Sequence, residues 1–379
     1  MRRGSMPCQA MMPCAHRSQN ANQDSLSCVM RLDRRTFLQG VALTLISACG
    51  ERSQAEPPYA ETVAVSNLVS PSASFMSDWE AFKGLFVNGE GRVIDNGNGG
   101  ISHSEGQGYG LLFAQAAGDQ ETFRTLHAWT EANLARQDVN LYAWLYDPSR
   151  AKGVADPNNA SDGDILIAWA LMQAARRWDI DAYDVRAGEI RNAIARHLIV
   201  ERQDRMVLLP GLSGFDHDDR TVFNPAYFIW PAFRDFSAGG MDKFWTRVMT
   251  DSQWLLTQSA FGPLQLPTDW CELTREGAIQ PANGWPARFG YDAIRIPVYL
   301  QMDGQQVPAP IVTFWESYLN AGHDVPAWID VNTAATPDFG PSEGGMAVIA
   351  RAIGRSVPET GLQGDYYSAV LKLLVGLTQ

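Results

Sequence analysis

The sequence predicts an all-α protein folded as a single toroid of helical hairpins. Eleven segments have the apolar spacing of helices, and few stretches alternate apolar and polar residues as strands do. Eleven helices are close to the twelve that six helical hairpins would contain. A chain of 379 residues is long enough for two or three domains. However, we find no composition typical of a linker once the N-terminal region has passed, which favours one domain.

The expected helices follow one another from about residue 77 to the C-terminus, separated by loops rich in Gly, Pro, Asn and Asp. They span residues 77–88, 107–118, 120–134, 163–178, 182–198, 225–237, 242–258, 291–302, 311–321, 342–354 and 365–377. The clearest pattern is at 163–178, where one helix face would carry Ile165, Ala168, Trp169, Met172 and Ala175. Ser161, with Asp164 three residues later, resembles a capping box at the start of this helix.

The segment 31–49 resembles a bacterial export signal. Arg34 and Arg35 precede an apolar run at 41–48, which is too short to span a bilayer comfortably and is followed by polar sequence. The arginine pair is typical of the Tat pathway, which exports folded proteins. The last four residues resemble a lipobox ending at Cys49, which would then carry the lipid. An ordinary secretory signal with an incidental cysteine is the alternative.

The chain therefore divides into three predicted regions. Residues 1–49 form the export signal, and we expect translation to start at Met30, which would place the arginine pair near the N-terminus. Residues 50–75 are rich in Ser, Pro, Ala and Glu without apolar periodicity, as in a flexible tether. Residues 76–379 form the single folded domain. We expect a periplasmic protein, held by a lipid anchor or free, or a secreted one.

Charge and composition restrict the partners. The net charge is −12, and the first 49 residues carry six Arg and two acidic residues, so the remainder carries −16. Nucleic acid or an anionic membrane surface would call for a basic surface, so we expect neither as a partner. Membrane contact would come only from the lipid anchor. Twelve Trp provide flat apolar faces that suit sugar rings, although many Trp lie in protein cores.

Three acidic residues stand where a loop meets a predicted helix. Glu105 is flanked by glycines in SHSEGQGYG, so that the backbone can approach a ligand closely. The other two are in NNASDGD (Asp162) and GYDAIR (Asp292). Each also has a purely structural explanation. The helix dipole favours Glu105 in a first turn, Asp162 or Ser161 would cap a helix, and Asp292 would pair with Arg295.

Taken together, the segments SEGQGYGLLFA, NNASDGDILIAWAL and YDAIRIPVYL resemble the signature blocks of glycoside hydrolase family 8. The resemblance runs from about Asp78 through GRVIDNG and the TDW at 268–270 to Gly344. It is closest to the endoglucanases associated with bacterial cellulose synthase complexes. It implies an (α/α)6 barrel, in agreement with the helix count. It also implies endo-acting hydrolysis of β-1,4-glucan with inversion of configuration, beside a membrane cellulose synthase complex.

The resemblance also implies roles for individual residues. Glu105 matches the proton donor, Asp292 the base that activates water, and Asp162 an acid that grips and distorts the sugar. The residues that match substrate-binding positions are Tyr291, Arg295, Trp144 and Tyr227, of which the last two also fit core positions. Inversion needs one protonated and one ionised carboxyl group. We expect Asp162 to raise the pKa of Glu105 by like-charge repulsion and to keep it protonated.

Other functions remain open at this point. Xylanase and chitosanase activities use the same mechanism in the family resembled, and a glucan-binding lipoprotein without catalysis is a different class. The six His show no metal-ligand spacing, and no phosphate-binding glycine loop is present, so no metal or cofactor is expected. The acidic run 216–219 is expected to be a solvated loop. The sequence leaves open whether cellulose is trimmed during synthesis or external polymer is degraded.

Overall fold

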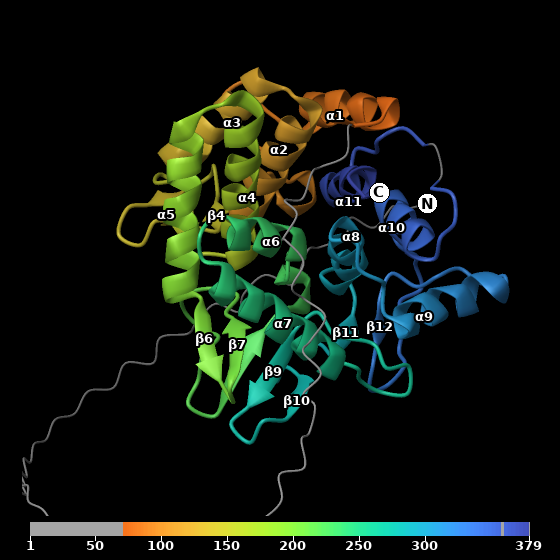
Figure 1. The fold of residues 1–379 in the computed structure, drawn as a ribbon. Coiled ribbons are helices and arrows are strands. Elements are labelled where there is room, and N and C mark those ends of the chain that lie inside the picture. Colours follow the sequence, from red (N-terminus) through yellow and green to blue (C-terminus); the bar gives the residue numbers. More distant parts are fainter. Residues whose placement is uncertain (1–70, 358–359, 379) are drawn as a thin grey trace, which may run out of the picture. The chain divides into compact units, whose positions relative to one another are not determined.

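The computed structural model describes residues 71–357 and 360–378. The predicted signal, including Cys49 and Met30, and nearly all of the predicted tether lie outside the described residues. Within them, eleven α-helices and twelve short strands are present (Figure 1). None of the helices in this part of the chain combines the length and apolar character needed to cross a membrane.

Helices make up most of the regular secondary structure in the described residues. The α-helices are α1 (Ala73–Phe86), α2 (Ser104–Ala117), α3 (Gln120–Asn133), α4 (Ser161–Trp178), α5 (Asp181–His197), α6 (Trp230–Ala238), α7 (Asp242–Gln258), α8 (Ile296–Met302), α9 (Ala309–Asn320), α10 (Glu343–Ala352) and α11 (Tyr366–Gly376). The short 3₁₀ helices are η1 (Asn96–Asn98), η2 (Pro225–Tyr227) and η3 (Ala293–Arg295). All eleven predicted helices are therefore present.

Two predicted helices are shorter than expected and begin with a separate 3₁₀ turn. The segment predicted at 225–237 is divided into η2 and α6, and the one at 291–302 is divided into η3 and α8. Both α6 and α8 have a proline in the first two positions. Proline lacks an N–H and disfavours helical geometry in the residue before it, so it starts a helix rather than continuing one.

The strands were missed by the sequence analysis because each has only two to four residues, too few to show an alternating pattern. The strands are β1 (Ser102–His103), β2 (Ala135–Arg136), β3 (Leu141–Tyr142), β4 (Leu145–Tyr146), β5 (Val154–Asp156), β6 (Ile199–Arg202), β7 (Arg205–Leu208), β8 (Arg220–Phe223), β9 (Cys271–Thr274), β10 (Ile279–Pro281), β11 (Arg288–Phe289) and β12 (Ile329–Asp330). They form antiparallel sheets in the orders β1-β4-β5, β10-β9-β8, β11-β12, β2-β3 and β6-β7.

The helices pack as hairpins that close into a circuit. Consecutive helices pair as α2 with α3, α4 with α5, α6 with α7, and α10 with α11. Between hairpins, α2 packs on α4, α4 on α6, α6 on α8 and α8 on α10, and α1 closes the circuit by contacting both α11 and α2. This arrangement is the toroid of helical hairpins that the sequence predicted.

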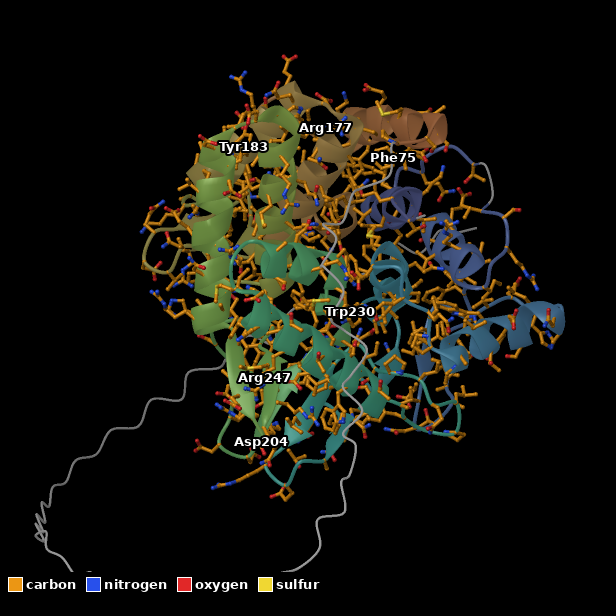
Figure 2. The ribbon with its side chains drawn as sticks, viewed as in Figure 1. Phe75, Arg177, Tyr183, Asp204, Trp230 and Arg247 are labelled. Carbon is orange, nitrogen blue, oxygen red and sulfur yellow. The ribbon has the colours of Figure 1, made fainter. Side chains whose placement is uncertain are left out.

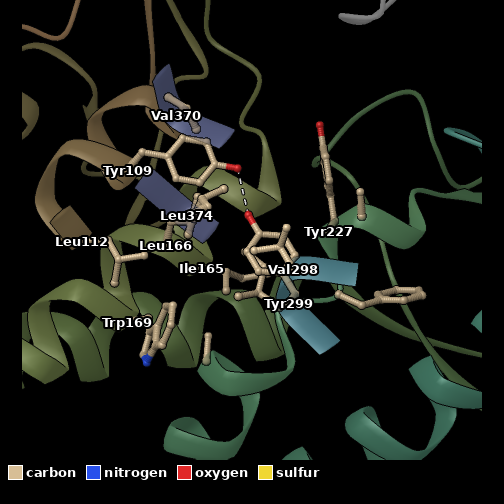
Figure 3. Packing of buried hydrophobic residues seen from close by; sticks show 14 of the residues in the cluster. Tyr109, Leu112, Ile165, Leu166, Trp169, Tyr227, Val298, Tyr299, Val370 and Leu374 are labelled. Carbon is tan, nitrogen blue, oxygen red and sulfur yellow. Dashed lines mark hydrogen bonds between the residues drawn. The ribbon is translucent and has the colours of Figure 1, made fainter. Parts of the chain in front are cut away.

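The core lies between these helices, and α4 is at its centre. Every residue of α4 from Ser161 to Ala175 is buried, including the apolar face predicted from the sequence. Figure 3 shows Ile165, Leu166 and Trp169 of α4 packed among side chains from other helices. The periodicity was therefore correct, but α4 is enclosed on all sides because it is an inner helix.

Several core Trp side chains also have their polar edge satisfied. Trp230, at the start of α6, lies in the interior of the described body (Figure 2). Its indole Nε1 donates to Ser252 Oγ of α7 at 3.1 Å. The indole of Trp169 on α4 likewise donates to Asp235 of α6, at 2.8 Å. These bonds let large rings fill the core without leaving a buried donor unpaired.

Two glycines let the starts of α2 and α4 approach each other closely. A Cβ added at Gly163 would lie 2.3 Å from Ser104 Oγ and 2.6 Å from the backbone nitrogen of Glu105. One added at Gly108 would lie 2.6 Å from Cβ of Leu166. Real Cβ atoms do not tolerate such contacts, so only glycine fits at both positions. The contact places the first turns of the two helices side by side.

We expect Gly163→Ala to lower the free energy of unfolding by about 1–3 kcal/mol, because the new methyl group must push α2 away from α4. Gly188→Ala on α5 is the matched control, since a Cβ there meets nothing within 4 Å. The control should gain up to ~1 kcal/mol from the better helix propensity of Ala. Urea unfolding of both variants measures this, and equal effects would contradict the close packing of α2 on α4.

Candidate active site

The three acidic residues singled out from the sequence meet at one buried arginine. Arg295 Nη1 donates to Glu105 Oε1, and Nη2 donates to Asp292 Oδ1 at 2.9 Å. Nη2 also lies 3.8 Å from Asp162 Oδ2. The arginine side chain is only 3% exposed. The predicted pairing of Asp292 with Arg295 is therefore present, but as part of a buried four-residue cluster rather than as an exposed pair.

Each acid of this cluster comes from a different part of the circuit. Glu105 is in the first turn of α2, and Asp162 is in the first turn of α4. Asp292 immediately precedes η3, which ends at Arg295. The close contact of α2 and α4 thus brings Glu105 and Asp162 together, and the η3–α8 segment brings the third acid with its arginine.

The start of α2 is held by a histidine that the sequence analysis did not single out as functional. His103 is the N-cap residue, and its Nδ1 accepts the N–H of Gly106 at 3.0 Å. An accepting Nδ1 carries no proton, so Nε2 is the protonated nitrogen and faces Asp95 Oδ2 at 3.4 Å. Nδ1 is also 3.7 Å from Glu105 Oε2. Histidine is an uncommon cap, so pattern rules did not reveal this role.

Two tyrosines approach Glu105 from the core side. Tyr109, one turn along α2, donates from its hydroxyl to Glu105 Oε1 at 3.5 Å. The hydroxyl of Tyr299 on α8 is 2.8 Å from the Tyr109 hydroxyl, as the dashed line in Figure 3 shows. Oε1 of Glu105 therefore faces both Arg295 and Tyr109.

The start of α4 differs from the predicted capping box. The helix begins at Ser161, its N-cap is Ala160, and no side chain caps it. Asp164 lies in the first turn as expected, but it is fully buried and accepts from Asn159 Nδ2 at 2.7 Å and from the N–H of Tyr142 at 2.9 Å. Burial raises the pKa of Asp164 to about 7. The capping interpretation of Ser161 and Asp162 was wrong.

The pKa order of the first two acids is the reverse of the prediction. Burial raises the pKa of Glu105, but the charge of Arg295, the charge of His103 and hydrogen bonds from Asp162 and Arg295 together outweigh it, so the pKa is lowered. Burial and the charge of Glu105 raise the pKa of Asp162 well above its usual value. Repulsion between the two carboxyl groups is present, but it acts on Asp162, because Arg295 bonds directly to Glu105 and is 3.8 Å from Asp162.

Asp292 lies in a different environment. Its side chain is 16% exposed, against 8% for Glu105 and 4% for Asp162. Burial raises its pKa to about 6, with Arg295 opposing the rise and Glu105 adding to it. Asn224 Nδ2 donates to Asp292 Oδ2 at 3.2 Å, which favours the ionised form. Asp292 is therefore ionised at neutral pH, and of the three acids it is the most open to solvent.

A fourth buried acid, Asp269, supports the segment that carries Asp292. Its Oδ1 accepts the N–H groups of Gly290, Asp292 and Ala293, at 3.1, 3.1 and 2.8 Å. In the sequence, the TDW at 268–270 was part of the resemblance to family 8, and no role was predicted for Asp269. Its partners are more than twenty positions away along the chain, so no local pattern could indicate them.

The remaining predicted binding residues lie around this cluster. The ring of Tyr227, at the end of η2, is 6.0 Å from the guanidinium carbon of Arg295. The backbone of Trp144 accepts from Ser104 at 3.1 Å, and its indole Nε1 has no hydrogen-bond partner within residues 71–357 and 360–378. Tyr291 is half-buried, and its carbonyl accepts from the Tyr367 hydroxyl. Tyr227 and Trp144 are both largely buried.

The acidic run 216–219 is a surface loop, as predicted. Asp216 pairs with Arg202, and Asp219 pairs with Arg220 at 3.1 Å. Among the residues that the structure describes, no group of three or more His, Cys, Asp or Glu is arranged to hold a metal ion.

Comparison with known proteins identifies the family. Residues 57–379 match the model of glycosyl hydrolases family 8. The chain belongs to this family. An endoglucanase from Cellulomonas uda is 37% identical over 283 residues, covering 74% of this chain and 78% of that protein. The match to the family model begins at residue 57, inside the segment predicted as a tether.

Solved structures agree with the family assignment. The crystal structure of endoglucanase Cel10, a family 8 glycosyl hydrolase from Klebsiella pneumoniae, is similar with a TM-score of 0.75 and 38% identity, covering 79% of this chain and 97% of that chain. The endo-β-1,4-glucanase CMCax from Acetobacter xylinum gives a TM-score of 0.75 and 35% identity, covering 80% of this chain and 97% of that chain. The predicted resemblance to family 8 and the (α/α)6 barrel fold class are confirmed, and the chain is a glycoside hydrolase.

We expect Arg295→Met to destabilise the protein by about 3–5 kcal/mol at pH 7, because the buried acids lose their counter-charge. The loss of stability caused by this substitution should be smaller at pH 4. In the wild type, the lowered pKa of Glu105 stabilises the fold above the unfolded pKa of that group and ceases to do so as pH falls. In the variant the buried carboxyl groups have raised pKa values, so their protonation at low pH favours the fold.

Urea unfolding at pH 4 and pH 7 measures the Arg295→Met effect. Arg150→Met is the control, since Arg150 pairs with Asp147 on the surface and should contribute no more than about 1 kcal/mol. A destabilisation of Arg295→Met that is equal at both pH values would contradict the electrostatic role of this arginine.

Proposed function

We propose that this protein is an endo-acting glucanase that hydrolyses β-1,4-glucan with inversion, with Glu105 as acid and Asp292 as base. The observation that carries the proposal is the pairing of these two carboxyl groups with different nitrogens of one buried guanidinium. The guanidinium group of Arg295 therefore lies between the carboxyl groups of Glu105 and Asp292 and holds them apart. The names of the family 8 relatives, endoglucanase and endo-β-1,4-glucanase, support the substrate class.

The base step follows from the surroundings of Asp292. An inverting hydrolase needs an ionised carboxylate beside a water molecule, with the two carboxyl groups roughly 6.5–9.5 Å apart. Asp292 is the most exposed of the three acids, and its pKa of about 6 leaves it ionised at neutral pH. Water can therefore reach Asp292 Oδ2, which Asn224 also contacts, and lose a proton to it as it attacks the anomeric carbon.

The acid step depends on a proton shared by Glu105 and Asp162. Two carboxyl groups in hydrogen-bond contact need one proton between them. In the free enzyme Arg295 favours the charge on Glu105, so Asp162 holds the proton. A sugar that enters and weakens the contact of Arg295 with Glu105 would move this proton to Glu105. Glu105 then donates it to the departing glycosidic oxygen, and Asp162 stays as a charged group beside the sugar.

Binding of the glucan would use aromatic and polar groups, because the polymer is uncharged. The aromatic residues proposed to contact the sugar are Tyr227, Tyr291 and Trp144. Tyr227 and Tyr291 adjoin the acid cluster, and the backbone of Trp144 contacts Ser104, next to Glu105. Xylan and chitosan would suit the same acids. The buried arginine offsets part of their charge, so the cluster itself does not favour a cationic polymer such as chitosan.

We also propose that the protein is exported to the periplasm through its twin-arginine segment and is held there by a lipid on Cys49, beside a membrane cellulose synthase complex. The motif at 31–49 supports export, and the family resemblance supports the cellulose synthase partner. Membrane fractionation of wild type and Cys49→Ser tests the anchor. Equal membrane association of both proteins would contradict lipidation.

We expect residues 50–379 to release reducing ends from carboxymethyl-cellulose. Glu105→Gln should lower the rate of reducing-end release by a factor of at least ~10², because the departing oxygen loses its proton donor. Reducing-end assays on carboxymethyl-cellulose, xylan and chitosan side by side measure both points. Activity on xylan or chitosan alone would contradict the proposed substrate but not the proposed mechanism. A wild-type protein that is inactive on all three polymers would contradict the proposed function.

The acidic limb of the pH profile should report Asp292. Because Asp292 must be ionised, kcat/KM should fall as pH decreases through about 6. Asn224→Asp should move this limb to higher pH, since it removes a donor and adds a like charge. The new carboxylate can still accept the N–H of Ala226, which Asn224 accepts at 2.9 Å, so η2 keeps its cap. A limb that stays in place or moves to lower pH would contradict Asp292 as the base.

A further inference from the structure

We propose that Asp269 is a positioning residue for the base. It holds the 290–293 segment so that the carboxylate of Asp292 does not cap η3 and points to Arg295 and Asn224 instead. This inference rests on the proposed function, in which Asp292 activates water. Asp269 lies in the segment before β9, and the residue is 7% exposed. It is buried beside Asp292, yet it does not contact Arg295 in the acid cluster.

The hydrogen bonds of Asp269 are concentrated on one oxygen. Oδ1 accepts three backbone N–H groups, from Gly290, Asp292 and Ala293, within 3.1 Å. These groups lie at the start of η3, where N–H groups have no partner inside the helix. A carboxylate from a distant segment therefore satisfies the donors that open this turn.

This arrangement leaves the side chain of Asp292 available for chemistry. Asp292 occupies the N-cap position of η3, where an Asp side chain usually folds back onto the backbone of the following turn. It makes no such bond here. The next two N–H groups are already used, since Ile294 donates to Gly290 O and Arg295 donates to Asp292 O, both at 3.0 Å. The carboxylate of Asp292 can therefore point to Arg295 and Asn224.

Asp269 is itself fixed in place. Its N–H donates to the carbonyl of Arg288 in β11 at 2.7 Å, and Thr268 Oγ1 donates to the carbonyl of Trp270 at 2.7 Å. On the other side, a Cβ added at Gly290 would lie 2.8 Å from Asp269 Oδ2. Only glycine at position 290 allows the carboxylate to approach the backbone this closely. Asp269 and Gly290 thus form one fitted contact.

A role limited to stability would predict different results. If Asp269 only stabilised the fold, its loss would lower the unfolding free energy and leave the turnover of the folded protein unchanged. If it positions the base, kcat falls while KM is kept, because Asp292 acts on water in the transition state and contributes little to holding the polymer. A displacement of about 1 Å at a catalytic group can lower the rate by ~10²-fold.

The test compares Asp269→Asn and Asp269→Ala in steady-state hydrolysis of carboxymethyl-cellulose. Asn keeps an acceptor oxygen for the three N–H groups, so we expect a loss in kcat of less than ~10-fold, whereas Ala should lose ~10²-fold with KM unchanged. Asp119→Ala is the control for destabilisation alone. Asp119 caps α3 and also accepts from Trp79 Nε1 and Lys83 Nζ, so its loss should cost about 2–3 kcal/mol of stability and leave kcat unchanged.

Gly290→Ala tests the same contact from the opposite side and keeps the inference testable if Asp269→Ala fails to fold. It should lower kcat with KM unchanged, and combining it with Asp269→Ala should cost no more than the larger single effect, because both disturb one contact. Wild-type kcat in Asp269→Ala, or equal losses in the Asn and Ala variants, would overturn the inference. Only a wild-type protein without activity would overturn the proposed function instead.

Discussion

The structure of the site depends on the burial of one guanidinium among three carboxyl groups. Arg295 contacts Glu105, Asp162 and Asp292, which come from three separate parts of the helical circuit. Buried charges are costly unless they are paired, so removing Arg295 would leave the ionised carboxyl groups without a counter-charge. The cluster therefore ties α2, α4 and the η3–α8 segment to each other. The same contacts that favour this packing also determine which acid holds a proton.

The acids differ because their surroundings differ. Glu105 bonds directly to the arginine, Asp162 faces Glu105 in the deepest position, and Asp292 is partly open to solvent. Three chemically similar groups thus acquire different pKa values from burial, neighbouring charge and hydrogen bonding. Supporting residues outside the cluster preserve this difference. His103 caps the helix that carries Glu105, and Asp269 holds the segment that carries Asp292.

Local patterns predicted much of this protein, and long-range contacts explain most of what they missed. Helical periodicity located all eleven α-helices, and the fold brings the three acids that the motifs indicated together at Arg295. The capping of α4 and the pKa order were wrong, because both depend on contacts across the fold. Instead of taking part in a capping box, Asp164 accepts hydrogen bonds from Asn159 and from the backbone N–H of Tyr142. The proposed role of Asp269 could not be predicted for the same reason, since the nearest of its three hydrogen-bond donors is 21 positions later in the chain.

The ion pair of Arg295 with Glu105 favours the charged form of Glu105 in the free protein. A double-mutant cycle of Arg295→Met and Glu105→Gln, measured by urea unfolding at pH 7, gives the strength of this pair. Strong pairing of this buried arginine with Glu105 predicts a coupling free energy of about 2–3 kcal/mol between the two substitutions. Effects that add within about 0.5 kcal/mol would show that the two groups act independently, and would contradict the account.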